Sequence, residues 1–362
     1  MKKICLFISD MGNSGGTERV SSILINQLCD KGLDVHVLNL YSSDKPFFQI
    51  SEKIQYNSLN NVRGAGLTAY FEITRKLRAY LRTNQINCLI TVESMLAIYA
   101  VPAVWNLKLN HIVWEHFNYH VDLGRRSRRI ARHLAALRAD NIVTLTERDK
   151  QFWLAESFCF ASVSAISNPL TFDVSNELAN INSKSFLSVG RLVDQKGYDL
   201  LIKAWSIVIK VHPEWKLNIV GNGERRDDLT VQIEKLNLSG SVNLIPATKE
   251  IDIYYKNASA YVMSSRYEGF PMVLLEAMCF GLPIVSFDCN TGPGEMIEHG
   301  ITGWLSNAED VQSLAESMIT AINSFNDPEF YACMSNSSLR KATEFNVESF
   351  ITKWEKILLC NG

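Results

Sequence analysis

The sequence predicts an α/β protein made of two doubly wound domains, and three observations support this prediction. A chain of 362 residues is longer than one hydrophobic core usually organises. Short apolar runs, each followed by a glycine-containing loop and a helical segment, occur in both halves, as expected for parallel βαβ units. A polar stretch broken by Pro169 separates the halves. We therefore expect an N-terminal domain over 1–170, a linker over 171–184 and a C-terminal domain over 185–345.

The first half begins with a strand, a glycine loop and a helix. Ile4–Ser9 is apolar, Gly15 and Gly16 close the loop that follows, and apolar residues then recur at helical spacing from Val20 to Leu28. A second strand is expected at Val35–Leu40. Further strands are expected at 88–92, 111–114 and 141–145.

The same order of elements restarts after the boundary. A strand is expected at 186–190, a loop at 191–197, a helix at Tyr198–Val211 and a strand at 216–220. This repeats the architecture of the first half but not its sequence. Two Rossmann-like domains facing each other across a cleft follow from this repetition.

Composition limits the classes of function. The net charge is −2, but residues 1–170 carry 20 Lys and Arg against 14 Asp and Glu, while the rest carries 16 against 24. The eight cysteines show no C-x-x-C pair and no metal-ligand spacing, which predicts reduced thiols in the cytosol. The uncharged tract 94–107 is too short to cross a bilayer.

The most informative stretch lies between Glu268 and Phe287. Pro271 suits the first turn of a helix and Gly281 suits the left-handed position after its end, so a helix is expected over 271–280. Glu276 is the one charged side chain between Gly269 and Phe287. A carboxylate on such a buried helix is costly unless donors surround it, so we expect a hydrogen-bonding partner for Glu276.

Glu268 and Glu276 flank the start of this helix. Glu276 lies about five residues into the helix, or roughly 7 Å along its axis. The free backbone amides of the first turn bind phosphate or carboxylate without a basic side chain. An anion flanked by two carboxylates that bind hydroxyl groups describes a nucleotide sugar.

The stretch RYEGFPMVLLEAMCFGLPIVSFD resembles the signature of the retaining glycosyltransferases of family four, which have the two-domain GT-B fold. The resemblance implies that Glu268 contacts the transferred sugar and that Glu276 holds the ribose of the nucleotide. It also implies that the backbone between them contacts sugar and phosphate, at Phe270, Pro271, Met272 and Val273. A purely structural helix with one stray glutamate is the alternative.

The resemblance covers nearly the whole chain. It implies that Arg191 and Lys196, in GRLVDQKG, neutralise the leaving diphosphate, although either residue alone could be a solvated surface cation. In GGTERV it places Gly16 beside the donor phosphates and the acceptor. It further implies that the C-terminal segment 346–362, with a helix over 347–359, crosses back to the first domain.

A dinucleotide-binding dehydrogenase is the rival interpretation of the first glycine loop. That class has G-x-G-x-x-G and an acidic residue that closes the second strand. Here the glycines are spaced G-x-x-G-G, and the strand ends Asn39-Leu40-Tyr41. Both features disfavour the dehydrogenase.

Two further assignments depend on the resemblance. It implies that His116, after a predicted strand, contacts the donor sugar, while the alternative is a structural histidine. It also implies that the loop Thr291–Glu295 lines the donor pocket, and the alternative there is a plain tight turn.

An arginine-rich segment carries an apolar stripe at Leu123, Ile130, Leu134 and Leu137, which predicts a basic amphipathic helix that binds an anionic membrane. A solvated helix and an internal network of ion pairs are the alternatives. Nucleic-acid binding is disfavoured by a pI of about 6.4. The residues predicted to bind the membrane are Arg125, Arg126, Arg128, Arg129 and Arg132.

We therefore predict a retaining glycosyltransferase that lies on the cytoplasmic face of the cell membrane. The expected donor is a nucleotide sugar, with UDP as the nucleotide and a hexose or N-acetylhexosamine as the sugar. The expected acceptor is a glycolipid or oligosaccharide, such as a lipid-linked precursor of lipopolysaccharide, capsule or O-antigen. No metal or cofactor is expected, because the chain contains no Asp-x-Asp. A sugar-nucleotide epimerase and a non-catalytic glycan-binding scaffold subunit are the alternatives.

Overall fold

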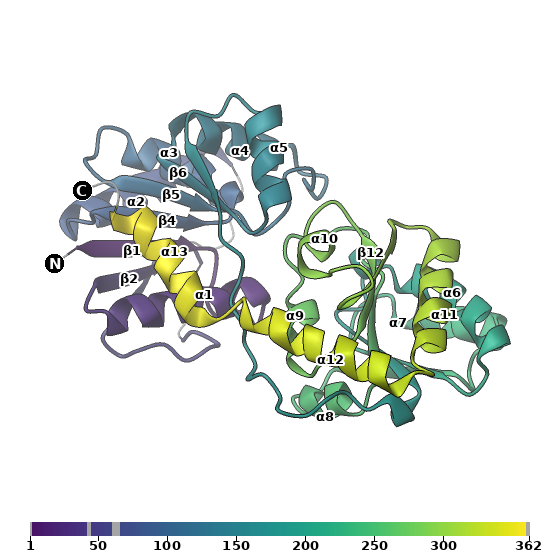
Figure 1. The fold of residues 1–362 in the computed structure, drawn as a ribbon. Helices are drawn as coiled ribbons and strands as arrows, with labels where there is room; N and C mark the ends of the chain where they lie inside the picture. Colours follow the sequence, from purple (N-terminus) through teal and green to yellow (C-terminus); the bar gives the residue numbers. More distant parts are fainter. Residues whose placement is uncertain (1, 42–44, 60–65, 360–362) are drawn as a thin grey trace. The chain divides into compact units, whose positions relative to one another are not determined.

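The computed structural model describes residues 2–41, 45–59 and 66–359. Its contacts divide the chain into two compact units (Figure 1). The first unit consists of Met1–Pro169 together with Val347–Gly362, and the second consists of Leu170–Asn346. Residues 171–184, which the sequence suggested as a linker, belong to the second unit.

The first unit is built on a parallel sheet. Within the described residues its strand order is β3-β2-β1-β4-β5-β6-β7. The order runs outward in one direction from β1 and in the other from β4, so these two strands flank a topological switch point. The strands are β1 (Lys3–Ile8), β2 (Asp34–Asn39), β3 (Gln55–Ser58), β4 (Cys88–Val92), β5 (Asn110–Trp114), β6 (Asn141–Thr144) and β7 (Ser162–Ala165).

Helices cover this sheet. The central strands β4 and β5 are buried along their whole length, which explains their nearly continuous apolar sequence. One core cluster joins β1, β2 and β4 to α2 and α3, and another joins β5 and β6 to α3, α4 and α5. The helices are α1 (Gly16–Asp30), α2 (Leu67–Thr83), α3 (Ala97–Val104), α4 (Arg126–Arg138), α5 (Glu147–Glu156) and α13 (Val347–Leu359).

The last helix, α13, belongs to the first unit although it ends the described chain. Figure 1 draws it in yellow beside α1. Its Trp354 is fully buried, with its ring centroid 4.9 Å from that of Trp114 at the end of β5. Lys31 and Glu355 form an ion pair of 2.9 Å that also joins α1 to α13.

The second unit has the same architecture. Its described strands form a parallel sheet in the order β10-β9-β8-β11-β12-β13, so β8 and β11 flank its switch point. The strands are β8 (Ser185–Val189), β9 (Lys216–Val220), β10 (Val242–Ile245), β11 (Ala260–Met263), β12 (Ile284–Asp288) and β13 (Gly303–Asn307). The helices are α6 (Tyr198–Val211), α7 (Arg226–Lys235), α8 (Ile251–Lys256), α9 (Met272–Cys279), α10 (Pro293–Met296), α11 (Val311–Ser324) and α12 (Pro328–Thr343). Its core contains Trp205 of α6 and Leu314 of α11, both fully buried.

The structure bears on two expectations for the whole chain, namely those about membrane-spanning segments and cysteines. In the described part of the chain, no helix combines the length and apolar character that crossing a membrane requires. The seven described cysteines are all free thiols, while Cys360 lies outside the described residues.

Replacing Trp354 with Ala should destabilise the first unit by about 3–5 kcal/mol, because it empties the space beside Trp114. Hydrogen exchange, followed separately in peptides of the two units, would measure this. Lys353→Ala, at an exposed position of the same helix, is the matched control and should cost less than about 0.5 kcal/mol. Equal effects of the two substitutions would show that α13 is not part of the core of the first unit.

Candidate active site

The switch point of the second unit brings together two charged residues that lie 72 positions apart. Lys196 is on the loop after β8, and Glu268 is on the loop after β11. The Nζ atom of Lys196 lies 2.7 Å from Oε1 of Glu268. Their side chains are only 16% and 8% exposed, so water screens this ion pair weakly.

Backbone contacts hold the two loops against each other. The side-chain amide of Gln195 donates to the carbonyl of Tyr267 at 3.0 Å, and the N–H of Arg266 donates to the carbonyl of Gln195 at 2.8 Å. The hydroxyl of Ser264 donates to the carbonyl of Lys196 at 2.9 Å. These three hydrogen bonds therefore fix the position of the loop of Lys196 against the loop of Glu268.

Gly197 permits this close approach. Its φ is +61°, and a Cβ atom at this position would lie 2.0 Å from the carbonyl oxygen of Ser264. A side chain here would therefore both strain the backbone and push the two loops apart. This contact therefore requires glycine at position 197, the last residue of GRLVDQKG.

The helix after Glu268 has nearly the predicted bounds. Pro271 occupies the N-cap of α9, and Gly281 follows the helix with a φ of +68°. Glu276 has the expected partner, because the hydroxyl of Tyr255 donates to its Oε2 atom at 2.9 Å. Tyr255 is fully buried at the end of α8.

A cavity of about 340 Å³ opens beside this helix, at the carboxyl ends of β8 and β9. Glu276 and Arg191 both line it. The remaining lining residues are Val189, Gly190, Val220, Gly221, Asn222, Ala247, Thr248 and Ile251. The predicted phosphate-binding arginine and the predicted ribose-binding glutamate thus share one cavity within the second unit.

The other predicted donor residues surround the start of α9. Phe270 and Pro271 are buried, whereas Met272 and Val273 are half-buried in the first turn. The stretch Thr291–Glu295 lies against the start of α9: a Cβ atom at Gly292 would lie 2.5 Å from Cδ of Pro271, and the Thr291 hydroxyl donates to the carbonyl of Glu268 at 2.5 Å. The sequence predicted a loop before a helix, but the helix begins earlier than expected: α10 starts at Pro293, so Pro293–Glu295 of this stretch are already helical.

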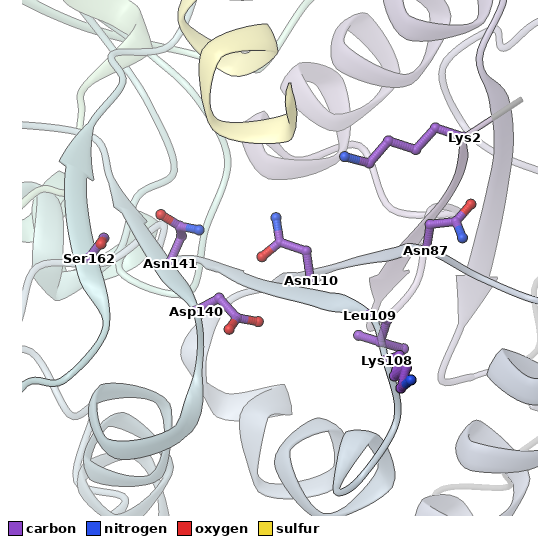
Figure 2. Close-up of a pocket in the computed structure, with 8 residues that line it drawn as sticks. All are labelled: Lys2, Asn87, Lys108, Leu109, Asn110, Asp140, Asn141 and Ser162. Carbon is purple, nitrogen blue, oxygen red and sulfur yellow. The ribbon is translucent and has the colours of Figure 1, made fainter. Parts of the chain in front are cut away.

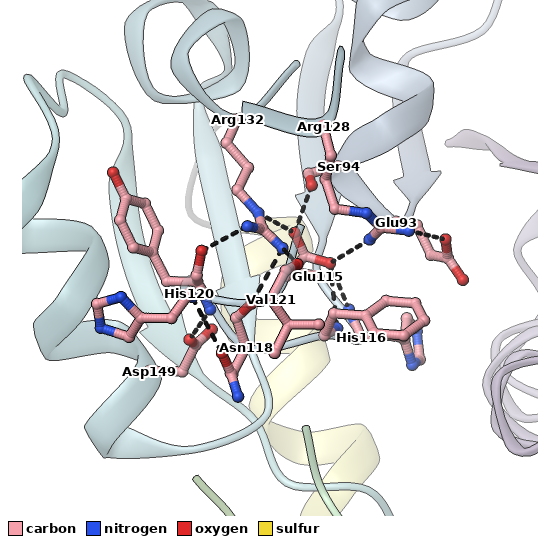
Figure 3. Close-up of polar contacts among 12 residues, drawn as sticks. Glu93, Ser94, Glu115, His116, Asn118, His120, Val121, Arg128, Arg132 and Asp149 are labelled. Carbon is pink, nitrogen blue, oxygen red and sulfur yellow. Dashed lines mark hydrogen bonds and ion pairs between the residues drawn. The ribbon is translucent and has the colours of Figure 1, made fainter. Parts of the chain in front are cut away.

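The first unit has its own polar cluster at the carboxyl ends of β4 and β5 (Figure 3). Glu115 is fully buried and accepts the backbone N–H groups of His116 and Phe117, both at 3.1 Å. Its Oε2 atom also accepts hydrogen bonds from Ser94 and from Arg132. The carboxylate at the centre of the cluster is therefore well satisfied.

His116 lies on this framework with its ring 4.4 Å from that of Trp114. Burial lowers its pKa to about 4, despite the opposing effect of Glu115, so the ring is neutral at pH 7. Among the described residues, none forms a hydrogen bond with its buried Nε2 atom. Gly16, the other residue predicted in this unit, begins α1 after the carboxyl end of β1 and is exposed.

The structure corrects the prediction that all five arginines face a membrane. Arg128 and Arg132 are 5% and 3% exposed and lie on the inner face of α4 with three alanines. Arg132 donates to Glu115 and to the carbonyls of Asn118 and Val121. These two arginines belong to an internal network because Glu93 and Glu115 compensate their charge. Arg125, Arg126 and Arg129 are exposed.

Comparison with known proteins decides the family. The model described as "Glycosyltransferase Family 4" matches residues 14–171, and the model described as "Glycosyl transferases group 1" matches residues 172–336. An uncharacterized glycosyltransferase of Haemophilus influenzae is 38% identical over 358 residues, which cover 99% of this chain and 100% of the relative. The chain belongs to the group 1 glycosyltransferases.

Two more comparisons place this glycosyltransferase among its relatives. The amylovoran biosynthesis glycosyltransferase AmsD of Erwinia amylovora is 28% identical over 367 residues, covering 99% of this chain and 100% of AmsD. A point mutant of S. aureus TarM, solved with fondaparinux, α-GlcNAc-glycerol and UDP, aligns with a TM-score of 0.78 at 16% identity. That alignment covers 99% of this chain and 100% of TarM, and it shows the GT-B fold.

A second, larger cavity in the glycosyltransferase contains none of the predicted site residues. It measures about 630 Å³ and lies at the amino ends of the strands of the first unit (Figure 2). Lys2, Asn87, Asn110 and Asp140 are among the residues that line it. It is therefore on the opposite edge of that sheet from Gly16 and His116.

Several residues at the two sites were missed by the sequence analysis. Asn222 follows a strand and precedes a glycine, a local signal that it lies at a carboxyl edge. Glu93 directly follows the strand expected at 88–92, so its place at a carboxyl edge had the same signal. Tyr255 and Thr248 carry no such signal, because their roles arise from contacts between distant segments. Among the described residues, no group of three or more His, Cys, Asp or Glu side chains could hold a metal ion.

Gly197→Ala should destabilise the second unit more than Gly300→Ala does. Both glycines have a positive φ, but nothing lies within 4 Å of the Cβ position at Gly300. Gly300→Ala should cost about 1–2 kcal/mol through the left-handed backbone alone. The clash with Ser264 should add about 1–3 kcal/mol at Gly197. Urea unfolding of both variants measures the difference, and equal losses would refute the close contact between the two loops.

Proposed function

We propose that this glycosyltransferase transfers a hexose or an N-acetylhexosamine from a UDP-sugar to a lipid-linked precursor of a surface polysaccharide, with retention at the anomeric carbon. The observation that carries the proposal is the cavity shared by Arg191 and Glu276, beside the ion pair of Lys196 with Glu268. AmsD acts in amylovoran biosynthesis by its name, and TarM was solved with UDP. Both relatives support this class of donor and product.

The proposed roles follow from charge and hydrogen-bonding capacity. Glu276 accepts hydrogen bonds from the ribose hydroxyls, and Tyr255 fixes the carboxylate for this contact. Arg191 and Lys196 neutralise the diphosphate as it leaves, when its negative charge increases. Glu268 binds a hydroxyl of the donor sugar and stabilises the positive charge that develops at the anomeric carbon.

The roles of His116 and Gly16 complete the proposal. A neutral His116 can donate or accept a single hydrogen bond at Nε2, which suits a sugar hydroxyl better than a phosphate. Gly16 lets the backbone at the start of α1 approach a ligand closely. Phe270, Pro271, Met272 and Val273 present the backbone of the first turn of α9 to sugar and phosphate.

Replacement of Glu268 and of Glu276 with glutamine should impair different functions. Glu276→Gln should weaken binding of free UDP by about 1–3 kcal/mol, since it removes a charge-assisted hydrogen bond to ribose. Glu268→Gln should leave UDP affinity nearly unchanged but strongly lower turnover. Calorimetry with UDP, combined with transfer kinetics, measures both effects.

Glu234→Gln, at an exposed position of α7, is the matched control and should change neither quantity. Equal losses of UDP affinity in the Glu268 and Glu276 variants would contradict the proposed roles. So would a fully active Glu268→Gln enzyme.

We further propose that the reaction needs no metal ion or other cofactor, because Arg191, Lys196 and helix amides supply the positive charge that the diphosphate requires. Transfer should therefore continue unchanged in EDTA. Abolition by EDTA and recovery with Mg²⁺ or Mn²⁺ would show that the phosphate site is wrongly assigned.

Membrane binding is proposed for the outer face of α4 and the loop that follows α5. Ile130 and Leu137, seven residues apart, are 55% and 40% exposed beside the exposed Arg126 and Arg129. The N–H of Phe160 donates to the carbonyl of Ala136, so the loop lies against the end of α4. Phe158 and Phe160 are 86% and 83% exposed there. Basic and aromatic groups together suit an anionic membrane surface.

Replacing Arg126 and Arg129 with Gln should weaken binding to anionic liposomes by about 2 kcal/mol at low salt. Replacing Phe158 and Phe160 with Ser should weaken binding at every salt concentration, because the apolar contribution is not screened. Co-sedimentation measures both. Lys203→Gln with Lys210→Gln, on exposed positions of α6, removes the same charge from the second unit and should have no effect. If all variants co-sedimented with liposomes as the wild type does, this face would be excluded as the membrane-binding surface.

A further inference from the structure

Glu93 has a backbone conformation that non-glycine residues rarely adopt. Its φ is +68° and its ψ is +132°, outside the left-handed helical region as well as the usual ones. The neighbouring chain holds it there: its N–H donates to the carbonyl of Trp114 at 2.8 Å, and its carbonyl accepts the N–H of Leu96 at 3.1 Å. The next residue, Ser94, donates to the buried Glu115. Strain that the surroundings maintain in this way points to a function.

The strained residue lies where ligands of open α/β sheets bind. Glu93 directly follows β4, and β4 and β1 flank the switch point of the first sheet. Crevices at the carboxyl ends of such strands are the usual binding places. Glu18, in the first turn of α1, is close enough to influence the ionisation of Glu93, so the glycine loop and Glu93 belong to the same edge.

The carboxylate of Glu93 is compensated in charge but not hydrogen-bonded. Its side chain is 25% exposed, and Nη2 of the buried Arg128 lies 3.7 Å from its Oε2 atom, which is too long for a hydrogen bond. Among the described residues, no donor forms a hydrogen bond with this carboxylate. Burial raises its pKa to about 7, although Arg128 opposes this and Glu115 and Glu18 add to it.

We propose that Glu93 is an acceptor-binding residue, whose carboxylate accepts a hydrogen bond from a hydroxyl group of an uncharged acceptor sugar at the switch point of the first unit. Arg128 acts as a positioning residue. Its guanidinium lies 4.4 Å from the ring of Phe117, and its Nη1 atom is 4.0 Å from Glu115. It therefore neutralises Glu93 from behind without occupying the carboxylate.

The chemistry of the edge selects a hydroxyl-bearing ligand. A carboxylate only accepts hydrogen bonds, and sugar hydroxyls donate them. Glu115 and Glu18 both raise the pKa of Glu93, and Arg128 opposes them. This excess of negative charge disfavours a phosphate at this position. The inference rests on the proposed transferase function.

Saturation-transfer NMR with the full chain tests the subsite directly. The probes are the methyl α-glycosides of glucose, galactose and N-acetylglucosamine, each with saturating UDP at pH 8, where Glu93 is ionised. At least one should bind the wild type, and Glu93→Gln should weaken that binding at least tenfold. Glu52→Gln, at an exposed position of the same unit, is the matched control and should bind as the wild type does. The assignment would be overturned if none of the glycosides bound the wild type. It would also be overturned if every glycoside that binds the wild type bound Glu93→Gln equally well.

UDP calorimetry of the same variants keeps this test separate from the transferase proposal. Glu93→Gln should bind UDP as tightly as the wild type does, because the donor site is in the second unit. Failure of the wild type to bind UDP would instead refute the transferase proposal.

A pair of variants tests the strain. Glu93→Gly and Glu93→Ala both remove the carboxylate, but only glycine relaxes at this φ. Neither should bind the glycosides, and Glu93→Gly should melt at the higher temperature. Equal melting temperatures would show that the backbone at Glu93 is not strained.

Discussion

The reversal of strand order within each sheet is the constraint on which the rest of the structure depends. Parallel strands with short connections leave one place in a sheet where neighbouring loops diverge to opposite sides. In the second unit that place is between β8 and β11, and it receives Lys196 and Glu268. In the first unit it is between β1 and β4, and it receives Gly16 and Glu93. Topology therefore decides which distant residues meet, and chemistry decides what they bind.

A buried carboxylate is the second feature that the two units share, but its partners differ between them. In the first unit Glu115 is saturated with hydrogen bonds from Ser94, Arg132 and the backbone, so it fixes the loop that carries His116. In the second unit Glu268 and Lys196 have each other as partners within a frame that Gly197 allows to close. A carboxylate such as Glu115, with all these hydrogen bonds made within the protein, has a structural role. Glu268 differs because its partner, Lys196, can also bind a phosphate. The carboxylate of Glu268 can then contact a substrate.

The sequence predicted the fold well because the fold depends on local patterns. The bounds of β4, β9, α6 and α13 agree with expectation, since apolar periodicity and glycine positions define them. The need for a partner at Glu276 was also evident from its apolar surroundings, although the identity of Tyr255 was not.

The arginine helix shows where such reasoning stops. The sequence could not tell which arginines of α4 point inward, because that depends on Glu93 and Glu115, which follow the distant strands β4 and β5. In the structure Arg128 and Arg132 are buried with three alanines, and Ile130 and Leu137 face outward, which reverses the usual pattern of an amphipathic helix. Glu93 was missed for the same reason: its importance lies in a backbone conformation that only the folded chain reveals.

The central claim is that the nucleotide of the donor binds at the switch point of the second unit. Hydrogen exchange of the full chain, with and without UDP, tests this most directly. The account predicts slower exchange in peptides that cover 190–197, 247–251 and 268–276, and no change in 93–97. Protection confined to the loops of the first unit, or no protection at saturating UDP, would contradict it.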